Sequence, residues 1–384
     1  MNTINAREIE NVAKQTGRQF YDLSNDVLFM NWSGCAVEFD FAGSIISADF
    51  IAMAGIEYNG IPTDPNVTTH LNWPWIAVYV DGELSFKQEI GGEAMSVLIY
   101  KNCGDCKEHH TIKIVKLTEN LKTQLGIKCL EFDGEVKSVK EDKKKRIEFI
   151  GDSITCGFGN MTDERDRWFY TMDEDATNSH GPLAAEKLDM DYSLVSISGI
   201  CATASTGIPM EYAMEDLYLY TDKVVQDKLA NCCGITEENR KMQDKLASEG
   251  KYEKFDFEKQ HNDYVVLNLG TNDATGISFA LKQAEENEHF KIGYRKLVET
   301  IRQANGSNTH IICALGTMNY YLWSDIKEIV ELYKKESGDK NISCYRYMQI
   351  VPADGLGACG HPSAITQSKM ADEIANEIRR IEKQ

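Results

Sequence analysis

A serine, a histidine and an asparagine in this sequence could together perform acyl transfer. Ser153 follows the apolar run 147–150 within Gly-Asp-Ser-Ile, so its hydroxyl is expected at the carboxyl end of a strand, where a helix begins. His361 precedes Pro362 at the junction between a loop and the terminal helix. A serine becomes a useful nucleophile when a base lies within hydrogen-bond reach, and an imidazole can accept and return the proton near neutral pH. Gly-Asp-Ser is also common in ordinary turns, so the assignment of Ser153 as a nucleophile depends on the segments that carry His361 and the asparagine.

The asparagine follows a second strand-like run, 265–269, within Gly-Thr-Asn-Asp. The side-chain amide of Asn272 is a donor of the kind that stabilises an oxyanion, and loss of such a donor costs about 3–4 kcal/mol. Asp152 and Asp273 flank the two key side chains. We expect both carboxylates to anchor turns by accepting backbone N–H bonds rather than to act in catalysis.

These strings resemble the sequence blocks of the SGNH (GDSL-type) hydrolase superfamily over residues 145–384. The blocks appear in the family's order, and each of the first three follows a predicted strand: 151–154, Ser198-Gly199, 270–273 and His361-Pro362. The resemblance implies that Ser153 is the nucleophile and His361 the general base. It also implies an oxyanion hole formed by the backbone N–H groups of Ser153 and Gly199 and the side chain of Asn272.

The resemblance leaves the partner of the histidine open. In this superfamily a carboxylate usually stands three residues before the histidine, but here that position is Ala358. Asp354 is the nearest upstream carboxylate and is a possible orienter of His361. We favour a Ser-His dyad with a backbone carbonyl as acceptor, because the loop between Asp354 and His361 is rich in glycine and offers no means of fixing the aspartate.

Composition indicates the class of protein and its partners. The chain has 384 residues, 42% of them hydrophobic, and a net charge of −19, so two domains and a globular fold are expected. The acidic balance argues against nucleic acid or anionic membranes as partners. The first residues do not look like a secretory signal, and the eleven cysteines lack a disulfide spacing. We therefore expect a cytoplasmic protein; its oligomeric state is left open.

The pattern of predicted elements divides the chain near the charged stretch 137–146. Residues 28–135 read as short strands with frequent turns, which favours a β-sandwich of jelly-roll type. After the boundary, strands at 147–150, 193–197, 264–269 and 311–315 alternate with helices, and the last helix carries Met370, Ile374, Ile378 and Ile381 at helical spacing. We predict a jelly-roll domain over 1–140 and a three-layer α/β/α catalytic domain with a parallel sheet over 141–384. The polar segment 221–260 is expected to be a helical insertion, either surface decoration or a lid.

The N-terminal half of the sequence resembles one particular family within this superfamily. Residues 32–39, 78–82 and 110–119 are similar to the N-terminal jelly roll of carbohydrate esterase family 2. That family implies removal of acetyl groups from sugar hydroxyls of hemicellulose, of mannan or xylan type. Tyr320, Tyr321 and Trp323 are candidate sugar-stacking residues, with core packing as the equal alternative. The family tryptophan before the histidine is replaced by Gly360, so the cleft should differ.

The sequence allows three other functional interpretations. A zinc site is suggested by Cys103, Cys106, His109 and His110, but the sequence has no second Cys-x-x-Cys to complete it. We therefore predict no metal and no cofactor. A lipase or thioesterase of the same superfamily would prefer longer acyl chains. A carbohydrate-binding protein with an inactive hydrolase half conflicts with the intact serine, asparagine and histidine.

Overall fold

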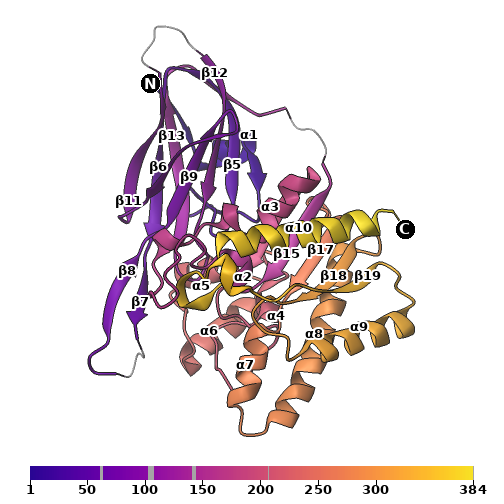
Figure 1. Cartoon of the computed structure of the whole chain (residues 1–384). Coiled ribbons are helices and arrows are strands. Elements are labelled where there is room, and N and C mark those ends of the chain that lie inside the picture. The colour runs from indigo at the N-terminus through magenta and orange to yellow at the C-terminus, as the bar shows by residue number, and fades with distance from the viewer. Residues whose placement is uncertain (61–63, 103–107, 141–143, 206, 384) are drawn as a thin grey trace.

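The chain forms a β-rich half and a mixed α/β half. The structure is a computed structural model that describes residues 1–60, 64–102, 108–140, 144–205 and 207–383. In Figure 1 the indigo and violet strands of the N-terminal half lie at one end of the molecule. The helices and the parallel strands of the C-terminal half lie at the other end, with the yellow C-terminal helix running across the sheet.

The N-terminal half is a sandwich of two antiparallel sheets. Its elements are β1 (Asn2–Asn5), α1 (Ala6–Val12), β2 (Lys14–Thr16), β3 (Phe20–Asp22), β4 (Val27–Phe29), β5 (Ala36–Gly43), β6 (Ile45–Met53), β7 (Gly55–Asn59), β8 (Thr68–Asn72), β9 (Trp75–Val80), β10 (Glu83–Glu89), β11 (Ala94–Lys101), β12 (Glu108–Lys116), β13 (Gln124–Phe132) and β14 (Glu135–Lys137). Among the described residues, one sheet has the order β11-β6-β13-β4-β3 with β1 beside β13, and the other has β10-β9-β12-β5-β14 with β2 beside β5.

Alternating side chains build the core between these sheets. In β6, every second residue from Ile46 to Ala52 is buried, as expected for a strand with one face covered. Phe41 of β5 packs edge to face against Tyr100 of β11 and Phe132 of β13, with ring centroids 6.2 and 6.4 Å apart. The two sheets therefore pack through aromatic contacts.

The C-terminal half contains the predicted parallel sheet. Its elements are β15 (Arg146–Gly151), α2 (Ser153–Cys156), the 3-10 turns η1 (Thr171–Asp173) and η2 (Ala176–Asn178), α3 (His180–Leu188), β16 (Asp191–Ser196), α4 (Met214–Leu217), α5 (Lys223–Leu229), α6 (Glu237–Ser248), β17 (Tyr264–Asn268), α7 (Thr271–Phe279), α8 (Gln283–Asn305), β18 (His310–Leu315), α9 (Trp323–Ser337), β19 (Ile342–Arg346), η3 (Pro352–Asp354), η4 (Ala358–Gly360) and α10 (Ala364–Ile381). The sheet order within the described residues is β16-β15-β17-β18-β19, and every neighbouring pair is parallel.

Helices cover both faces of this sheet, which gives the expected α/β/α layers. Apolar residues of α3 and α10 pack with Phe149 and Val266 on one face. Residues of α8 and α9 pack with Val265 and Ile311 on the other face. Strands buried on both sides explain the nearly continuous apolar runs in the sequence.

The structure adds elements that the sequence interpretation missed. Strands β1 to β3 and helix α1 precede the β-region that we expected to begin near residue 28. The fifth parallel strand, β19, was also missed, because Ile342–Arg346 is a short edge strand with mixed polar and apolar residues.

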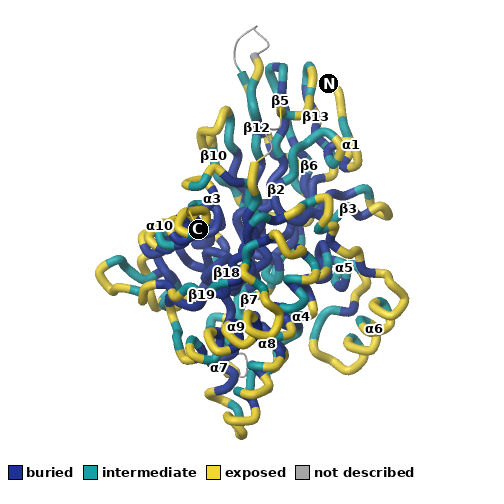
Figure 2. The backbone as a smooth tube through the Cα atoms, turned by 90° about the vertical axis from the view of Figure 1, so that its right-hand side faces the viewer, coloured by how far each residue is buried: buried dark blue, intermediate teal, exposed yellow. Residues whose placement is uncertain are grey.

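The insertion at 221–260 has two different parts. Helix α6 has no buried residue, and Figure 2 shows it as exposed. Helix α5, in contrast, packs Val225 against Val27 and Phe29 of the sandwich. Just before α5, the Thr221 carbonyl accepts a hydrogen bond from the Trp32 indole at 2.8 Å. The first part of the insertion is therefore a structural bridge between the two halves.

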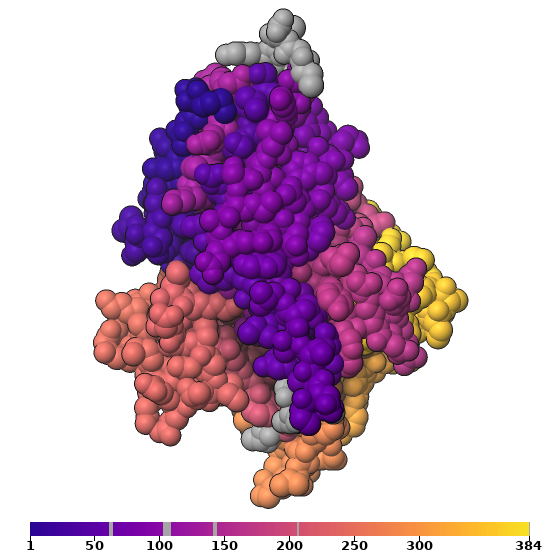
Figure 3. Space-filling model, turned by 90° about the vertical axis from the view of Figure 1, so that its left-hand side faces the viewer, coloured from indigo at the N-terminus to yellow at the C-terminus, as the bar shows by residue number. Residues whose placement is uncertain are grey.

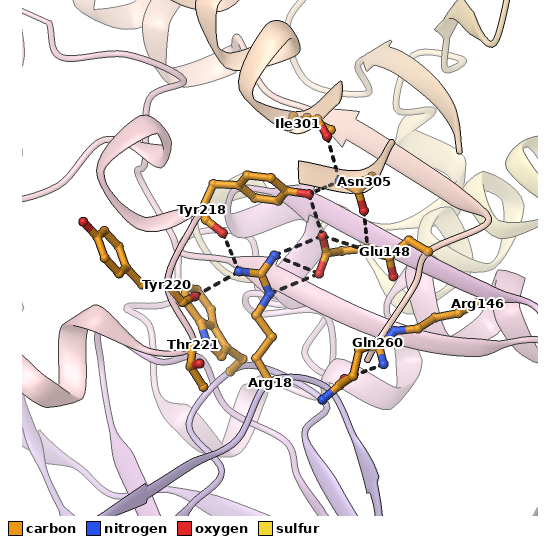
Figure 4. Close-up of polar contacts among 11 residues, drawn as sticks. Arg18, Arg146, Glu148, Tyr218, Tyr220, Thr221, Gln260, Ile301 and Asn305 are labelled. Carbon is orange, nitrogen blue, oxygen red and sulfur yellow. Dashed lines mark hydrogen bonds and ion pairs between the residues drawn. The ribbon is translucent and has the colours of Figure 1, made fainter. Parts of the chain in front are cut away.

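A buried ion pair also joins the halves. Arg18 lies between β2 and β3, and its guanidinium binds both carboxylate oxygens of Glu148 on β15 at 3.0 and 3.1 Å (Figure 4). Both side chains are fully buried. The guanidinium also donates to the Tyr218 carbonyl and lies over the rings of Phe255 and Phe257. Charge, hydrogen bonds and aromatic faces together satisfy an arginine that would otherwise be costly to bury.

The hairpin β7–β8 extends from the sandwich along the other half. In the space-filling view it runs between the 220–260 segment and the segment that follows β15 (Figure 3). His70 of β8 lies 3.1 Å from the Phe169 carbonyl and stacks on Tyr170 with ring centroids 4.1 Å apart. The N-terminal half therefore contacts the loop that lies near the candidate nucleophile.

Candidate active site

Ser153 lies where its sequence context predicted. Strand β15 ends at Gly151, and Asp152 caps the short helix α2 by accepting a hydrogen bond from the Ile154 N–H at 3.0 Å. Ser153 is the first helical residue and is buried, with 8% of its surface exposed. Its hydroxyl is thus fixed at the carboxyl edge of the parallel sheet, where ligands of open α/β folds bind.

His361 makes the hydrogen bond that a serine nucleophile requires. Its Nε2 lies 2.9 Å from Ser153 Oγ, and its Nδ1 lies 3.1 Å from the Ala358 carbonyl oxygen. Because that carbonyl can only accept, Nδ1 carries the proton and Nε2 is free to accept from Ser153. Phe158 tilts against the imidazole with ring centroids 4.4 Å apart. Burial lowers the pKa of His361 from 6.5 to about 4, so the ring is a neutral base at pH 7.

Backbone contacts between two glycine-containing loops hold the base beside the nucleophile. The Ala358 N–H donates to the Gly159 carbonyl at 3.1 Å, and the Ala364 N–H donates to the Asn160 carbonyl at 3.1 Å. A Cβ on Gly159, whose φ is +62°, would lie 2.6 Å from the Ala358 Cβ. A Cβ on Gly357 would lie 2.2 Å from the Gly159 carbonyl oxygen. Glycine is therefore required at both positions for the loops to approach this closely.

Asp354 is not beside the histidine ring. Both of its carboxylate oxygens bind Lys369 Nζ, at 2.6 and 2.7 Å. Its carbonyl accepts from the Ser363 hydroxyl at 2.6 Å, which ties the loop to the start of α10. The Ala358 carbonyl, rather than this carboxylate, accepts the Nδ1 proton of His361.

The other two expected blocks lie at the same edge of the sheet. Gly199 follows β16 with φ +80°, and the next carbonyl, of Ile200, accepts from Asn272 Nδ2 at 3.0 Å. The same Nδ2 lies 3.4 Å from the Asp152 carboxylate. Among the described residues, the N–H groups of Ser153 and Gly199 have no hydrogen-bond acceptor. Asn272 Nδ2 has a second N–H, which faces the Asp152 carboxylate only at 3.4 Å, so this edge of the sheet offers three N–H donors for an oxyanion.

The two flanking aspartates anchor backbone, as expected. Asp152 caps α2, whereas both carboxylate oxygens of Asp273 accept from the Ala202 N–H at 3.0 and 3.1 Å. Asp273 therefore holds the loop after Gly199 rather than its own turn. Burial raises the pKa of each carboxyl to about 7.

The aromatic residues proposed for sugar stacking lie after β18. Tyr320 donates its hydroxyl to the Tyr347 carbonyl at 3.0 Å and faces the Arg346 guanidinium. Tyr321 is 62% exposed, and Trp323 begins α9 and packs against the core. Within the part of the chain that is described, no contact joins these three side chains to Ser153 or His361.

Other aromatic residues, which the sequence analysis missed, lie near the histidine. Phe158 stacks on Phe169 with ring centroids 3.9 Å apart, and the adjacent Trp168 is 50% exposed. The His70–Tyr170 stack continues this group toward the hairpin β7–β8. Nothing in the local sequence marks these residues, because Phe169 reaches Phe158 through the fold of the loop after α2, and His70 joins them from the N-terminal half.

The metal hypothesis has no structural support among the described residues, where no group of His, Cys, Asp and Glu could hold a metal ion. Cys103 and Cys106 lie outside the described residues. No described helix has both the length and the apolar character needed to cross a membrane.

A serine hydroxyl bound to a neutral imidazole, with free N–H groups beside it at the edge of a parallel sheet, defines a serine-hydrolase type of site. The chain belongs to the GDSL-like lipase/acylhydrolase family, whose match covers residues 147–374. The resemblance drawn from the sequence blocks is thereby confirmed.

Similar proteins extend the comparison to the N-terminal half. The cellulase/esterase CelE of Acetivibrio thermocellus is 26% identical over 338 residues, which are 85% of this chain and 36% of CelE. An acetylxylan esterase / glucomannan deacetylase of Cellvibrio japonicus is 35% identical over 120 residues, 29% of this chain and 32% of that protein. The chain thus spans about a third of the length of the curated relatives it matches.

Solved structures of family 2 carbohydrate esterases share the fold. One from Clostridium thermocellum, in complex with cellohexaose, has a TM-score of 0.76 and 25% identity, covering 96% of this chain and 98% of that one. The acetyl xylan esterase Est2A from the rumen bacterium Butyrivibrio proteoclasticus has a TM-score of 0.78 and 19% identity, covering 99% and 98%. The resemblance to carbohydrate esterase family 2, including a sandwich before the hydrolase region, is confirmed by these similarities.

Proposed function

We propose that this protein is a serine esterase that removes O-acetyl groups from acetylated hemicellulose oligosaccharides of mannan or xylan type. The observation that carries the proposal is the 2.9 Å contact between His361 Nε2 and Ser153 Oγ at an edge that also bears free N–H donors. The family match and the esterase relatives support the reaction class.

The reaction follows from the geometry of these groups. Ser153 Oγ attacks the acetyl carbon while His361 Nε2 takes the hydroxyl proton. The Ser153 and Gly199 N–H groups and the Asn272 amide donate to the oxyanion. His361 then protonates the sugar oxygen, the C–O bond breaks, and an acetyl-serine remains. A water molecule, deprotonated by the same imidazole, attacks that acetyl group and releases acetate.

Ala358 takes the place of a triad acid in this scheme. Its carbonyl accepts the Nδ1 proton and fixes the tautomer of His361. The carbonyl is neutral, so it stabilises the imidazolium less than a carboxylate would.

The substrate class rests on the relatives and on charge. The net charge of −19 disfavours polyanionic partners and is compatible with a neutral acetylated sugar. We also propose a cytoplasmic location, supported by the nine described cysteines, all of which are free thiols. Fractionation of cells that make the protein tests the location; recovery outside the cytoplasm would contradict it.

Acetate release tests the function directly. Acetylated mannan and xylan oligosaccharides, together with 4-nitrophenyl esters of acetate, butyrate and octanoate, should show preference for acetyl groups. Ser153→Ala should lower kcat at least about 10³-fold, because Ser153 is the one nucleophile among the described residues that binds His361 Nε2. Ser248→Ala, at the exposed end of α6, is the matched control and should retain full activity. Activity that rises with acyl length would favour a lipase or thioesterase, and an active Ser153→Ala variant would reject the scheme.

A further inference from the structure

A buried carboxylate from the N-terminal half reaches the candidate oxyanion hole. Glu119 lies in the loop between β12 and β13 and has no exposed surface. Its Oε2 accepts a hydrogen bond of 2.6 Å from the N–H of Ser198, the residue before Gly199. The same oxygen lies 3.8 Å from the Sγ of Cys156, the last residue of the helix that begins with Ser153. One oxygen atom of the sandwich thus contacts both turns that form the site.

The loop that carries Glu119 is itself held firmly. Lys116 Nζ is buried and donates to the carbonyls of Asn31, Thr118 and Glu119 at 2.8, 2.6 and 3.0 Å. The Glu119 N–H donates to the carboxylate of Glu174 at 3.1 Å. The three bonds from Lys116 fix the backbone on which Glu119 stands, and the bond to Glu174 is one further contact with the hydrolase half.

Stability alone is a poor explanation for this carboxylate. Within the described part of the chain, Glu119 Oε1 is buried without a hydrogen-bond partner. Burial also raises the pKa of Glu119, as expected for a charge removed from water. A buried carboxylate with one oxygen unpaired is costly, and Glu174 shares this feature; Glu119 differs in that its other oxygen binds the Ser198 N–H beside the site.

We propose that Glu119 is a positioning residue that fixes the Ser198–Gly199 turn so that the Gly199 N–H points at the oxyanion. This inference rests on the proposed esterase function and assigns part of the active-site geometry to the N-terminal half. Glu119 does not touch the substrate. It acts by holding the Ile197–Ser198 peptide, one position before the peptide that carries the Gly199 N–H, and so fixes the start of the turn in which Gly199 has a φ of +80°.

The structure provides a matched pair of variants. Glu119→Ala leaves the Ser198 N–H without its acceptor. Glu174→Ala leaves the Glu119 N–H without its acceptor in the same buried interface, but within the described residues Glu174 accepts no hydrogen bond from the Ser198–Gly199 turn. Both variants therefore remove one buried carboxylate and leave one backbone N–H unpaired. Glu119→Gln keeps the shape and an acceptor oxygen for Ser198.

Kinetics separate positioning from folding. Glu119→Ala should lower kcat on 4-nitrophenyl acetate by about 10- to 100-fold with little change in KM, somewhat less than complete loss of an oxyanion donor. Glu119→Gln should restore most of kcat. Glu174→Ala should lose comparable thermal stability but keep kcat within about threefold of the wild type. Equal loss of kcat in the two alanine variants, or no loss in Glu119→Ala, would overturn the proposal.

A second readout does not require the natural substrate. A fluorophosphonate labels an active serine through a tetrahedral adduct whose oxygen occupies the oxyanion hole. Labelling of Ser153 should slow in Glu119→Ala and not in Glu174→Ala. If the wild type is labelled but releases no acetate from any ester, the proposed function fails while the comparison still tests Glu119. If the wild type is not labelled at Ser153, both proposals fail.

Discussion

Asp354 binds Lys369 through both carboxylate oxygens, at 2.6 and 2.7 Å, and leaves His361 to the carbonyl of Ala358. Ser153 and His361 thus form a hydrogen-bonded pair in which a neutral backbone group contacts the other ring nitrogen of the histidine. The glycine-rich sequence between Asp354 and His361 favoured this arrangement, and the pairing of Asp354 with a lysine of α10 gives its physical reason.

Neutralising Asp354 should therefore have little effect on catalysis. We expect Asp354→Asn to keep kcat within about threefold of the wild type, whereas neutralising a true triad acid costs about 10⁴-fold. The lysine partner is more than half exposed, so the loss of stability should not exceed about 1 kcal/mol. Initial rates and thermal melts measure both quantities; a loss of activity of several thousandfold would restore Asp354 as the orienting acid.

The pH profile should reflect the buried histidine. His361 acts as a base only when neutral, and its pKa is lowered by burial from 6.5 to about 4. The rate kcat/KM should therefore stay on its plateau as pH falls below 6.5 and decline only as pH approaches about 4. Initial rates between pH 3.5 and 8, with incubation controls for stability, measure this limb.

A variant of Phe158 checks the cause of that shift. Its ring covers the imidazole, so Phe158→Ala should admit water and move the acid limb back toward pH 6.5. A wild-type limb already at 6.5, or a limb that does not move in the variant, would contradict desolvation as the cause.

Removal of the amide donor should impair catalysis more than binding. Asn272→Ala should lower kcat about 10²- to 10³-fold, as expected for loss of one oxyanion donor, with a much smaller change in KM. Because Asn272 also donates to the Ile200 carbonyl, thermal melts must show that the variant remains folded. Full kcat in a folded Asn272→Ala variant would remove this residue from the proposed oxyanion hole.

The buried Arg18–Glu148 pair should matter for stability rather than for chemistry. Arg18→Met leaves Glu148 buried without its cation, which typically costs about 3–5 kcal/mol. Lys241→Met breaks the exposed pair with Glu237 and should cost less than about 1 kcal/mol. Denaturant unfolding of both variants measures the difference; equal stability of the two would contradict the structural role of the buried pair.

The reacting groups could be predicted because each follows a local rule. Ser153, Gly199 and Asn272 stand directly after apolar strands, and parallel strands place their carboxyl ends along one edge. His361 stands directly before a long amphipathic helix with a clear start at Ser363. Strand-to-turn transitions and helix starts leave strong signals in a single sequence.

Features made by packing between distant segments left no such signal. The Ala358 carbonyl reaches the histidine because Cys359 and Gly360 adopt positive φ angles, which residue types alone do not dictate. The sequence did not point to Phe158 and Phe169, since their stack depends on the fold of the loop after α2 and their surroundings on how the hairpin β7–β8 docks there. Glu119 likewise ends the segment 110–119 that resembles the family's jelly roll, and its sequence context gives no link to the site.

The junction described above restricts how such proteins can diversify by recombination. Arg18 and Glu119 belong to the first half, yet their charged groups bind partners of the second half, among them Glu148 and Ser198. A gene exchange that replaced one half alone would bury an unmatched arginine and release the turn beside the nucleophile. We therefore expect chimaeras between homologues to fold and act only when both sets of contacts are transferred together.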